Sequence, residues 1–252
     1  MKIALVSDIH VEFDDDKGEK FFSSMALVEA DVLVVAGDIH SEVKSLIDTL
    51  RRFGGQFPNV VAVLGNHDVW GSVPRERQSI VKYALSPYKN VHLLDRSSVD
   101  IDGVNFSGCT LWADPRPRGR MTMDMRMFLG DPDTWMLEEH LEDVKFVNET
   151  VTGTDVLVTH FLPHINSVDP KWLGSSGNWY FHVRTDESID TAKSLVLHGH
   201  THDPCMWNSA AGALVVCNPR GYPSEKMRDT YAPKLFETIN QGQPYEFRRT
   251  WA

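Results

Sequence analysis

Five short apolar runs in this chain of 252 residues are each followed directly by a polar motif built from His, Asp or Asn. Each run has the length and the β-branched content of a buried strand. The runs are residues 3–6, 32–36, 60–64, 156–158 and 195–197. Because open α/β sheets bind ligands at the carboxyl ends of their strands, a fold that aligns these runs brings all five motifs to one edge.

The five motifs supply carboxylate, amide and imidazole groups, which are ligands of divalent cations. Read one at a time, several have an ordinary structural explanation: Asp38 could cap the following helix, and Asn66 could stabilise a turn. The motifs are Asp8-Ile9-His10, Gly37-Asp38, Gly65-Asn66-His67-Asp68, Thr159-His160 and Gly199-His200-Thr201-His202. Gathered at one edge they could hold two metal ions, so the sequence predicts a metalloenzyme.

Three alternating imidazoles, His198, His200 and His202, form the strongest single signal. Alternate residues of an extended segment point to the same side, and three histidines there indicate a metal site more than a histidine-rich turn. Imidazole together with carboxylate favours Zn, Fe, Mn, Ni or Co over Ca. We expect His200 and His202 to be ligands and His198 to support them, because Gly199 turns the chain between them.

The motif at residues 65–68 contains two predicted catalytic residues. The amide oxygen of Asn66 suits a divalent ion. His67 is predicted to act as a proton donor beside the metals, and Asp68 to fix the tautomer of His67 or to raise its basicity.

Helical patterns alternate with strands in the first half of the chain, which favours a parallel sheet with right-handed crossovers. The expected helices lie near 20–29, 42–53 (closed by Gly54-Gly55), 74–85 and 138–151. The further strands expected are 91–94, 98–101, 104–107, 206–209 and 213–216, with a final pair near 235–239 and 245–249. Together they predict an α/β fold in one domain spanning 1–252, with two mixed sheets flanked by helices.

The segment 114–135 breaks this pattern, with three prolines, four arginines and four alternating methionines. Structureless stretches of this length inside compact domains are often lids or binding loops. The segment could cap the metal edge with arginines near the substrate, or it could be a surface excursion whose methionines fill gaps against the body. The arginines are Arg116, Arg118, Arg120 and Arg126, and the methionines are Met121, Met123, Met125 and Met127.

Taken together, the five motifs resemble the signature of the calcineurin-like metallophosphoesterase superfamily, which reads D-x-H, G-D, G-N-H-[DE], H and G-H-x-H in this order. All five blocks are present between Asp8 and His202, and no ligand position is substituted. The resemblance implies a four-layer αββα sandwich that carries two metal ions close to each other.

The resemblance also implies which residues would hold each ion. The first ion would be bound by Asp8, His10, Asp38 and His202. The second would share the bridging Asp38 and be bound by Asn66, His160 and His200. His67 matches the family's histidine that protonates the leaving group or steadies the transition state.

Two cations held in this way would lower the pKa of a bridging water and clamp the phosphoryl oxygens for in-line attack by hydroxide. Protonated His67 would then supply a proton to the departing alkoxide. We therefore expect hydrolysis of a small phosphodiester or phosphomonoester, that is, a phosphodiesterase or phosphatase. Manganese is the favoured metal, with Fe, Zn, Ni and Co as alternatives.

Two further residues are weaker candidates for contact with the substrate. His164 follows His160 by four residues and could reach the substrate or lie in a solvated loop. Arg220, in the segment after the last core strand, could bind phosphate or brace its own loop.

Other classes of protein fit the sequence less well. A formal net charge of −10 argues against strong nucleic-acid binding and against a DNA-repair nuclease, which would need a basic groove. A non-catalytic protein-binding scaffold on the same fold is disfavoured, because such members typically lose the catalytic histidine or some ligands, and His67 is intact.

The remaining expectations concern the cellular setting. No apolar stretch approaches the roughly 18 residues of a membrane helix. Cys109, Cys205 and Cys217 form no paired pattern, so buried free thiols are expected. Since Met1-Lys2 runs directly into the first strand, no signal peptide is expected, and we predict a cytoplasmic protein. No feature of the sequence predicts the oligomeric state.

Overall fold

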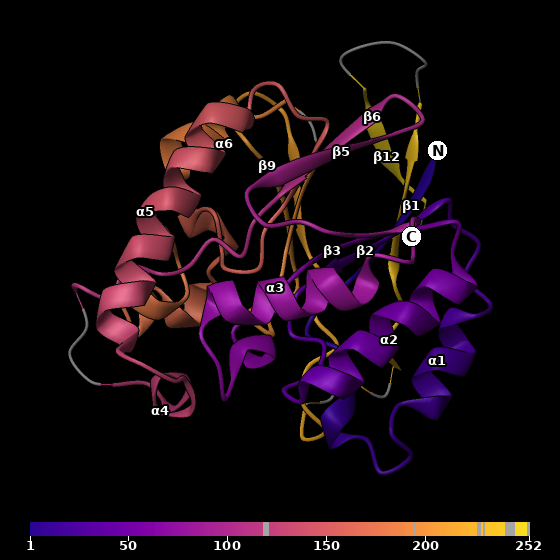
Figure 1. Cartoon of the computed structure of the whole chain (residues 1–252). Coiled ribbons are helices and arrows are strands. Elements are labelled where there is room, and N and C mark those ends of the chain that lie inside the picture. The colour runs from indigo at the N-terminus through magenta and orange to yellow at the C-terminus, as the bar shows by residue number, and fades with distance from the viewer. Residues whose placement is uncertain (118–120, 194, 226–227, 229, 240–244, 251–252) are drawn as a thin grey trace.

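Two six-stranded mixed sheets form the centre of the computed structural model (Figure 1). The structure describes residues 1–117, 121–193, 195–225, 228, 230–239 and 245–250. The first sheet contains β1 (Lys2–Val6), β2 (Val32–Ala36), β3 (Asn59–Val63), β4 (Val91–Leu93), β11 (Lys234–Thr238) and β12 (Phe247–Arg249). The second contains β5 (Ser97–Ile101), β6 (Val104–Gly108), β7 (Val156–Val158), β8 (Leu195–His198), β9 (Cys205–Asn208) and β10 (Leu214–Cys217).

Both sheets have a parallel centre, with antiparallel strands at both edges of the second sheet and at one edge of the first. The strand orders are β12-β11-β1-β2-β3-β4 and β5-β6-β7-β8-β10-β9. Strands β1 to β4 run parallel, as do β6, β7, β8 and β10. The five motifs follow β1, β2, β3, β7 and β8. Parallel pairing therefore puts the motifs of each sheet at one edge.

Helices cover the outer faces of the sheets. They are α1 (Glu19–Met25), α2 (Val43–Gln56), α3 (Pro74–Leu85), α4 (Met123–Met127), α5 (Pro132–Thr150) and α6 (Asp186–Thr191). Short 3-10 helices are η1 (Val11–Phe13), η2 (His67–Val69), η3 (Ile165–Ser167), η4 (Pro170–Trp172) and η5 (Asn178–Tyr180). Figure 1 shows α1, α2 and α3 on one side of the sheets and α5 and α6 on the other. Within the described residues, no helix is long and apolar enough to cross a membrane.

The buried core has three apolar layers, which separate the four layers of an αββα sandwich. Because alternate strand residues point to opposite faces, Ala4 and Val6 pack under the first group of helices, whereas Ile3 and Leu5 face the other sheet. Phe106 of β6 lies fully buried in the layer between the sheets. The predicted α/β sandwich is thus confirmed.

Several predicted boundaries were wrong. Helix α2 does not stop before Gly54-Gly55 but continues to Gln56. Helix α5 begins at Pro132, six residues before the predicted start, because Asp131 caps it and Pro132 suits the first turn. The segment 114–135 is consequently not structureless, since it contains α4 and the first turn of α5.

Truncation of Phe106 tests the layer between the sheets. We expect Phe106→Ala to lower the free energy of unfolding by about 3–5 kcal/mol, since a fully buried ring leaves a cavity. Urea unfolding followed by fluorescence measures the change. Leu27→Ala is the control, because Leu27 is 84% exposed and should shift stability by no more than about 0.5 kcal/mol. Equal effects of the two substitutions would contradict this packing.

Candidate metal centre

The motif loops adopt backbone conformations that L-residues rarely take. Asp8, His10, Asp38, His200 and His202 have φ values of 48°, 42°, 54°, 71° and 50°. A non-glycine residue in this left-handed region costs of order 1–3 kcal/mol, and such residues cluster at functional sites. The strain therefore marks the same edge that the sequence motifs predict.

Four of the predicted ligands converge on one point. His10 Nε2 lies 3.2 Å from His202 Nε2 and 3.6 Å from Asp38 Oδ2. His202 Nε2 also lies 3.5 Å from Asp8 Oδ1. Two imidazole nitrogens and two carboxylates therefore face a common centre, which is the donor set predicted for the first ion.

A second group of predicted ligands meets on the other side of Asp38. His160 Nε2 lies 2.8 Å from Asn66 Oδ1 and 3.4 Å from Asp38 Oδ1. The ring of His200 is 5.1 Å from that of His160. Since Asp38 faces His10 with Oδ2 and His160 with Oδ1, its carboxylate stands between the two groups, in the position of a bridge.

Backbone carbonyls fix the orientation of two of the imidazoles. His160 Nδ1 lies 2.8 Å from the carbonyl oxygen of Ala36, and His200 Nε2 lies 3.1 Å from that of Tyr180. A carbonyl only accepts hydrogen bonds, so each of these nitrogens carries the proton of a neutral ring. His160 Nε2 and His200 Nδ1 are thereby left with free lone pairs for a cation.

Carboxylates orient the other two imidazoles in the same way. His202 Nδ1 lies 3.0 Å from Glu225 Oε2, and His10 Nδ1 lies 3.4 Å from Glu12 Oε1. The Nε2 atoms of both rings then face the centre that they share with Asp8. His10, His202 and His160 are thus held from outside with Nε2 turned toward the other donors, as in metal-binding histidines, and His200 is held from outside by Nε2.

Burial keeps most of these imidazoles neutral. It lowers the pKa of His10 to about 4 and that of His200 to about 3, and it lowers the pKa of His160 well below the ordinary range. His202 differs: burial acts to lower its pKa, but the hydrogen bond to Glu225 and the charge of Asp8 outweigh burial and raise it. A neutral ring offers the lone pair that a metal needs.

The carboxylates at the centre lack a compensating charge within the described part of the chain. Burial raises the pKa of Asp8, and it raises that of Asp38 together with the nearby charges of Asp68 and Asp8. No described Lys or Arg pairs with them, and Asp8 Oδ2 is buried without a hydrogen-bond partner among the described residues. Such groups call for cations, so the residues present fit two divalent ions.

Asp68 has a different role from the one predicted. Its two oxygens accept backbone N–H groups from Asp38 (3.0 Å), Ile39 (2.8 Å), His40 (2.9 Å) and Gly65 (2.7 Å). Burial raises its pKa to about 6, while these N–H donors act in the opposite direction. Asp68 therefore holds the second and third motif loops together, and none of its hydrogen bonds among the described residues goes to the ring of His67.

The ring of His67 lies beside the two donor groups and is held by other side chains. It stacks on Trp70, with ring centroids 3.9 Å apart. Its Nε2 lies 3.0 Å from the hydroxyl of Tyr222 and 3.7 Å from Asp124 Oδ1, and its Nδ1 lies 3.8 Å from Glu12 Oε1. His67, Asp38 and Asp124 line a pocket of about 340 Å³.

Prediction from the sequence missed the residues that orient the motif side chains. Glu12, Tyr180 and Glu225 hold the outer nitrogens of the imidazoles, and Tyr222 contacts His67. Only two weak signals were present: Glu12 stands two residues after the first motif, and Tyr222 ends the segment that contains Arg220.

The two weaker substrate candidates have structural contacts. His164 Nδ1 accepts the backbone N–H of Asn166, and its ring packs against Trp207. Arg220 donates to the carbonyl of Ile9 and pairs with both oxygens of Asp14. Arg220 therefore braces the loop after the first motif rather than its own loop, and His164 caps η3.

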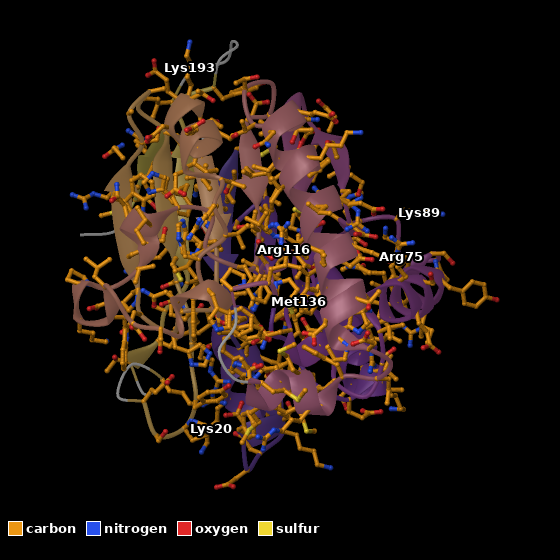
Figure 2. All side chains as sticks on the ribbon, turned by 90° about the vertical axis from the view of Figure 1, so that its left-hand side faces the viewer. Lys20, Arg75, Lys89, Arg116, Met136 and Lys193 are labelled. Carbon is orange, nitrogen blue, oxygen red and sulfur yellow. The ribbon has the colours of Figure 1, made fainter. Side chains whose placement is uncertain are left out.

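The arginine-rich segment contacts the pocket through an acid. Arg116 pairs with Asp114 in its own loop. Figure 2 views the molecule from this side and labels both Arg116 and Met136 of α5. Arg118 and Arg120 lie outside the described residues, and Arg126 is exposed. Asp124 lines the pocket and accepts a hydrogen bond from Trp70 Nε1. Of the methionines, Met125 is buried, whereas Met121, Met123 and Met127 are exposed.

Substitution of Gly65 tests how closely the motif loops approach each other. A Cβ on Gly65 would lie 2.1 Å from Asp38 Oδ1 and 2.7 Å from His160 Cε1, so Gly65→Ala must displace both side chains. We expect Mn²⁺ affinity, measured by calorimetry, to fall by roughly 10- to 100-fold. Gly55→Ala is the control, because a Cβ there meets nothing within 4 Å. Unchanged Mn²⁺ affinity in folded Gly65→Ala would contradict the assigned geometry.

Solved structures of other proteins share this fold. The structure of a phosphopantetheinyl hydrolase from Mycobacterium tuberculosis matches with a TM-score of 0.70 and 18% identity, over 90% of this chain and 92% of that one. A dimetal phosphatase from Danio rerio matches with a TM-score of 0.55 and 11% identity, over 94% of this chain and 92% of that one. At these identities the likeness shows the fold alone.

Sequence comparison identifies the family. An uncharacterised protein, L509, of Acanthamoeba polyphaga mimivirus is 21% identical over 283 residues, which cover 94% of this chain and 96% of the relative. The model of the calcineurin-like phosphoesterase superfamily domain matches residues 1–232. This match covers the five motifs and nearly the whole chain, and the chain therefore belongs to the calcineurin-like phosphoesterase superfamily.

Proposed function

We propose that this protein is a dinuclear-metal phosphoesterase that hydrolyses a small phosphate ester. The observation that carries the proposal is the placement of Asp38 between His10 and His160, in a group of four histidines that are each held by an outer acceptor. Family membership supports the same reaction. The names of the two structural neighbours, a phosphopantetheinyl hydrolase and a dimetal phosphatase, also agree with it.

The proposed ligands form two sets that share one residue. Asp8, His10, Asp38 and His202 would bind the first ion, and Asp38, Asn66, His160 and His200 the second. When bound, the two ions would lower the pKa of a water molecule between them and neutralise charge on the phosphoryl oxygens. Manganese is our first choice, because Mn suits a mixed set of carboxylate, amide and imidazole donors.

His67 is the proposed proton donor to the leaving group. Its ring lines the pocket beside both ligand sets but is oriented by Trp70 and Tyr222. The carboxylates of Glu12 and Asp124, at 3.8 Å and 3.7 Å from its nitrogens, would stabilise the charge of the protonated ring. A general acid in this position protonates the departing oxygen and typically contributes a factor of about 10²–10⁴ to the rate.

The activity test uses Mn²⁺ with bis- and mono-p-nitrophenyl phosphate. We expect release of p-nitrophenol by the native protein, no measurable activity for Asp38→Ala, and kcat lowered by roughly 10²–10⁴ for His67→Ala with its metal content retained. His92→Ala is the control, since His92 lies on β4 outside the site. A folded native protein that is inert toward both esters with every candidate metal would contradict the proposal.

Metal removal tests the cofactor independently of activity. An ion that binds only the folded state stabilises it by about 2.7 kcal/mol at 100 times its Kd. We therefore expect chelation to lower Tm and Mn²⁺ to restore it in the native protein. In Asp38→Ala, which lacks the shared carboxylate, Mn²⁺ should shift Tm far less. Equal shifts in the two proteins would mean that the stabilising ions bind elsewhere.

A further inference from the structure

A second pocket, of about 520 Å³, lies next to the metal pocket. Both pockets are lined by Phe181, Thr201, His202 and Glu225. The two pockets are therefore neighbours that meet at these four residues. The volume is within the range that holds a small-molecule group.

The second pocket differs from the metal pocket in its chemistry. Its walls include Leu162, Val168, Trp172 and Phe181. Trp172 is 52% exposed and Phe181 is 38% exposed, although large aromatic side chains are usually more deeply buried. Apolar surface gathered in a recess marks a binding site more often than an ordinary surface.

The turn that contains the proposed ligands His200 and His202 also contacts the aromatic residues of the second pocket. The ring of Phe181 lies 4.7 Å from that of His200, which is bonded to the carbonyl of the preceding Tyr180. Trp172 donates from Nε1 to Asp203 Oδ2 at 2.9 Å, and Asp203 directly follows His202. The pocket is thus positioned with respect to the site by direct contacts.

Charged groups in the second pocket already have partners. Lys171 is the only lysine or arginine among its described lining residues, and it pairs with Asp203 and Asp169. Glu225 pairs with His202. Among the described lining residues no unpaired cation is therefore available for an anionic group, and the occupant expected from these walls is uncharged and apolar.

We propose that the second pocket binds an uncharged, apolar or aromatic ester arm of a phosphodiester, which makes the protein a phosphodiesterase. The inference rests on the proposed function, and it narrows the substrate class. His67, the proposed proton donor, does not line this pocket among the described residues. The arm held there is consequently the one that stays on phosphorus. Water forms the new P–O bond. The P–O bond to the other arm breaks, and that arm leaves as the protonated alcohol or phenol.

A homologous series of substrates tests the pocket. In methyl, propyl, pentyl and phenyl p-nitrophenyl phosphates, p-nitrophenol is the common leaving group and the retained arm grows. With the Mn²⁺-loaded protein we expect kcat/KM to rise by up to roughly fourfold for each methylene that is buried. Trp172→Ala should flatten this gradient.

Two further variants control for nonspecific effects. Leu173→Ala removes a neighbouring side chain that is 55% exposed and does not line the pocket, so it should keep the native gradient. Trp172→Phe retains an apolar wall without the hydrogen bond to Asp203, so it should keep most of the gradient in kcat/KM.

The outcomes separate the two proposals. A native protein that hydrolyses the methyl ester but shows no gradient would overturn the pocket assignment and leave the proposed function standing. Equal losses for all esters in Trp172→Ala would overturn it too, because the side chain would then act on the metal site. Inertness of the folded, metal-loaded protein toward every ester would overturn the proposed function and the pocket assignment together.

Discussion

Buried negative charge is the constraint on which the rest of the site depends. Asp8 and Asp38 lie at the centre of the αββα sandwich edge, and no described Lys or Arg compensates them. Carboxylates in such a place are stable only with cations or protons. Burial lowers the pKa of the surrounding His10, His160 and His200 and so keeps these imidazoles neutral. The site is therefore organised to receive positive charge, and the family's phosphoester chemistry follows from what two cations do to water and phosphate.

The two sheets act on the site jointly. His160 follows a strand of the second sheet, yet its Nδ1 is bonded to the carbonyl of Ala36 at the end of a strand in the first. Asp68 accepts four backbone N–H groups from the loops of the second and third motifs. Such contacts hold several residues at positive φ, and the apolar layers of the sandwich offset this strain. The geometry of the site is thus set by sheet packing as much as by the motifs.

Sequence reasoning predicted the positions of the motif residues and the type of fold because strand patterns and polar motifs are local signals. The backbone contacts of Asp68 were not predicted, since three of its four partners come from a loop about thirty residues away. Glu225 and Tyr180 were missed because only tertiary folding brings them to the histidines. The segment 114–135 drew attention to its arginines, but among its described residues Thr122 and Asp124 line the pocket. The predicted end of the helix at residue 53 was wrong because Gly54-Gly55 lie inside α2, which continues to Gln56.

Anomalous diffraction from crystals of the Mn²⁺-loaded protein tests the central claim most directly. The account predicts two peaks, one among Asp8, His10 and His202 and the other between Asn66 and His160, with the carboxylate of Asp38 joining them. No peak in this region, or a single ion that leaves one of the two ligand sets without metal at saturating Mn²⁺, would contradict it.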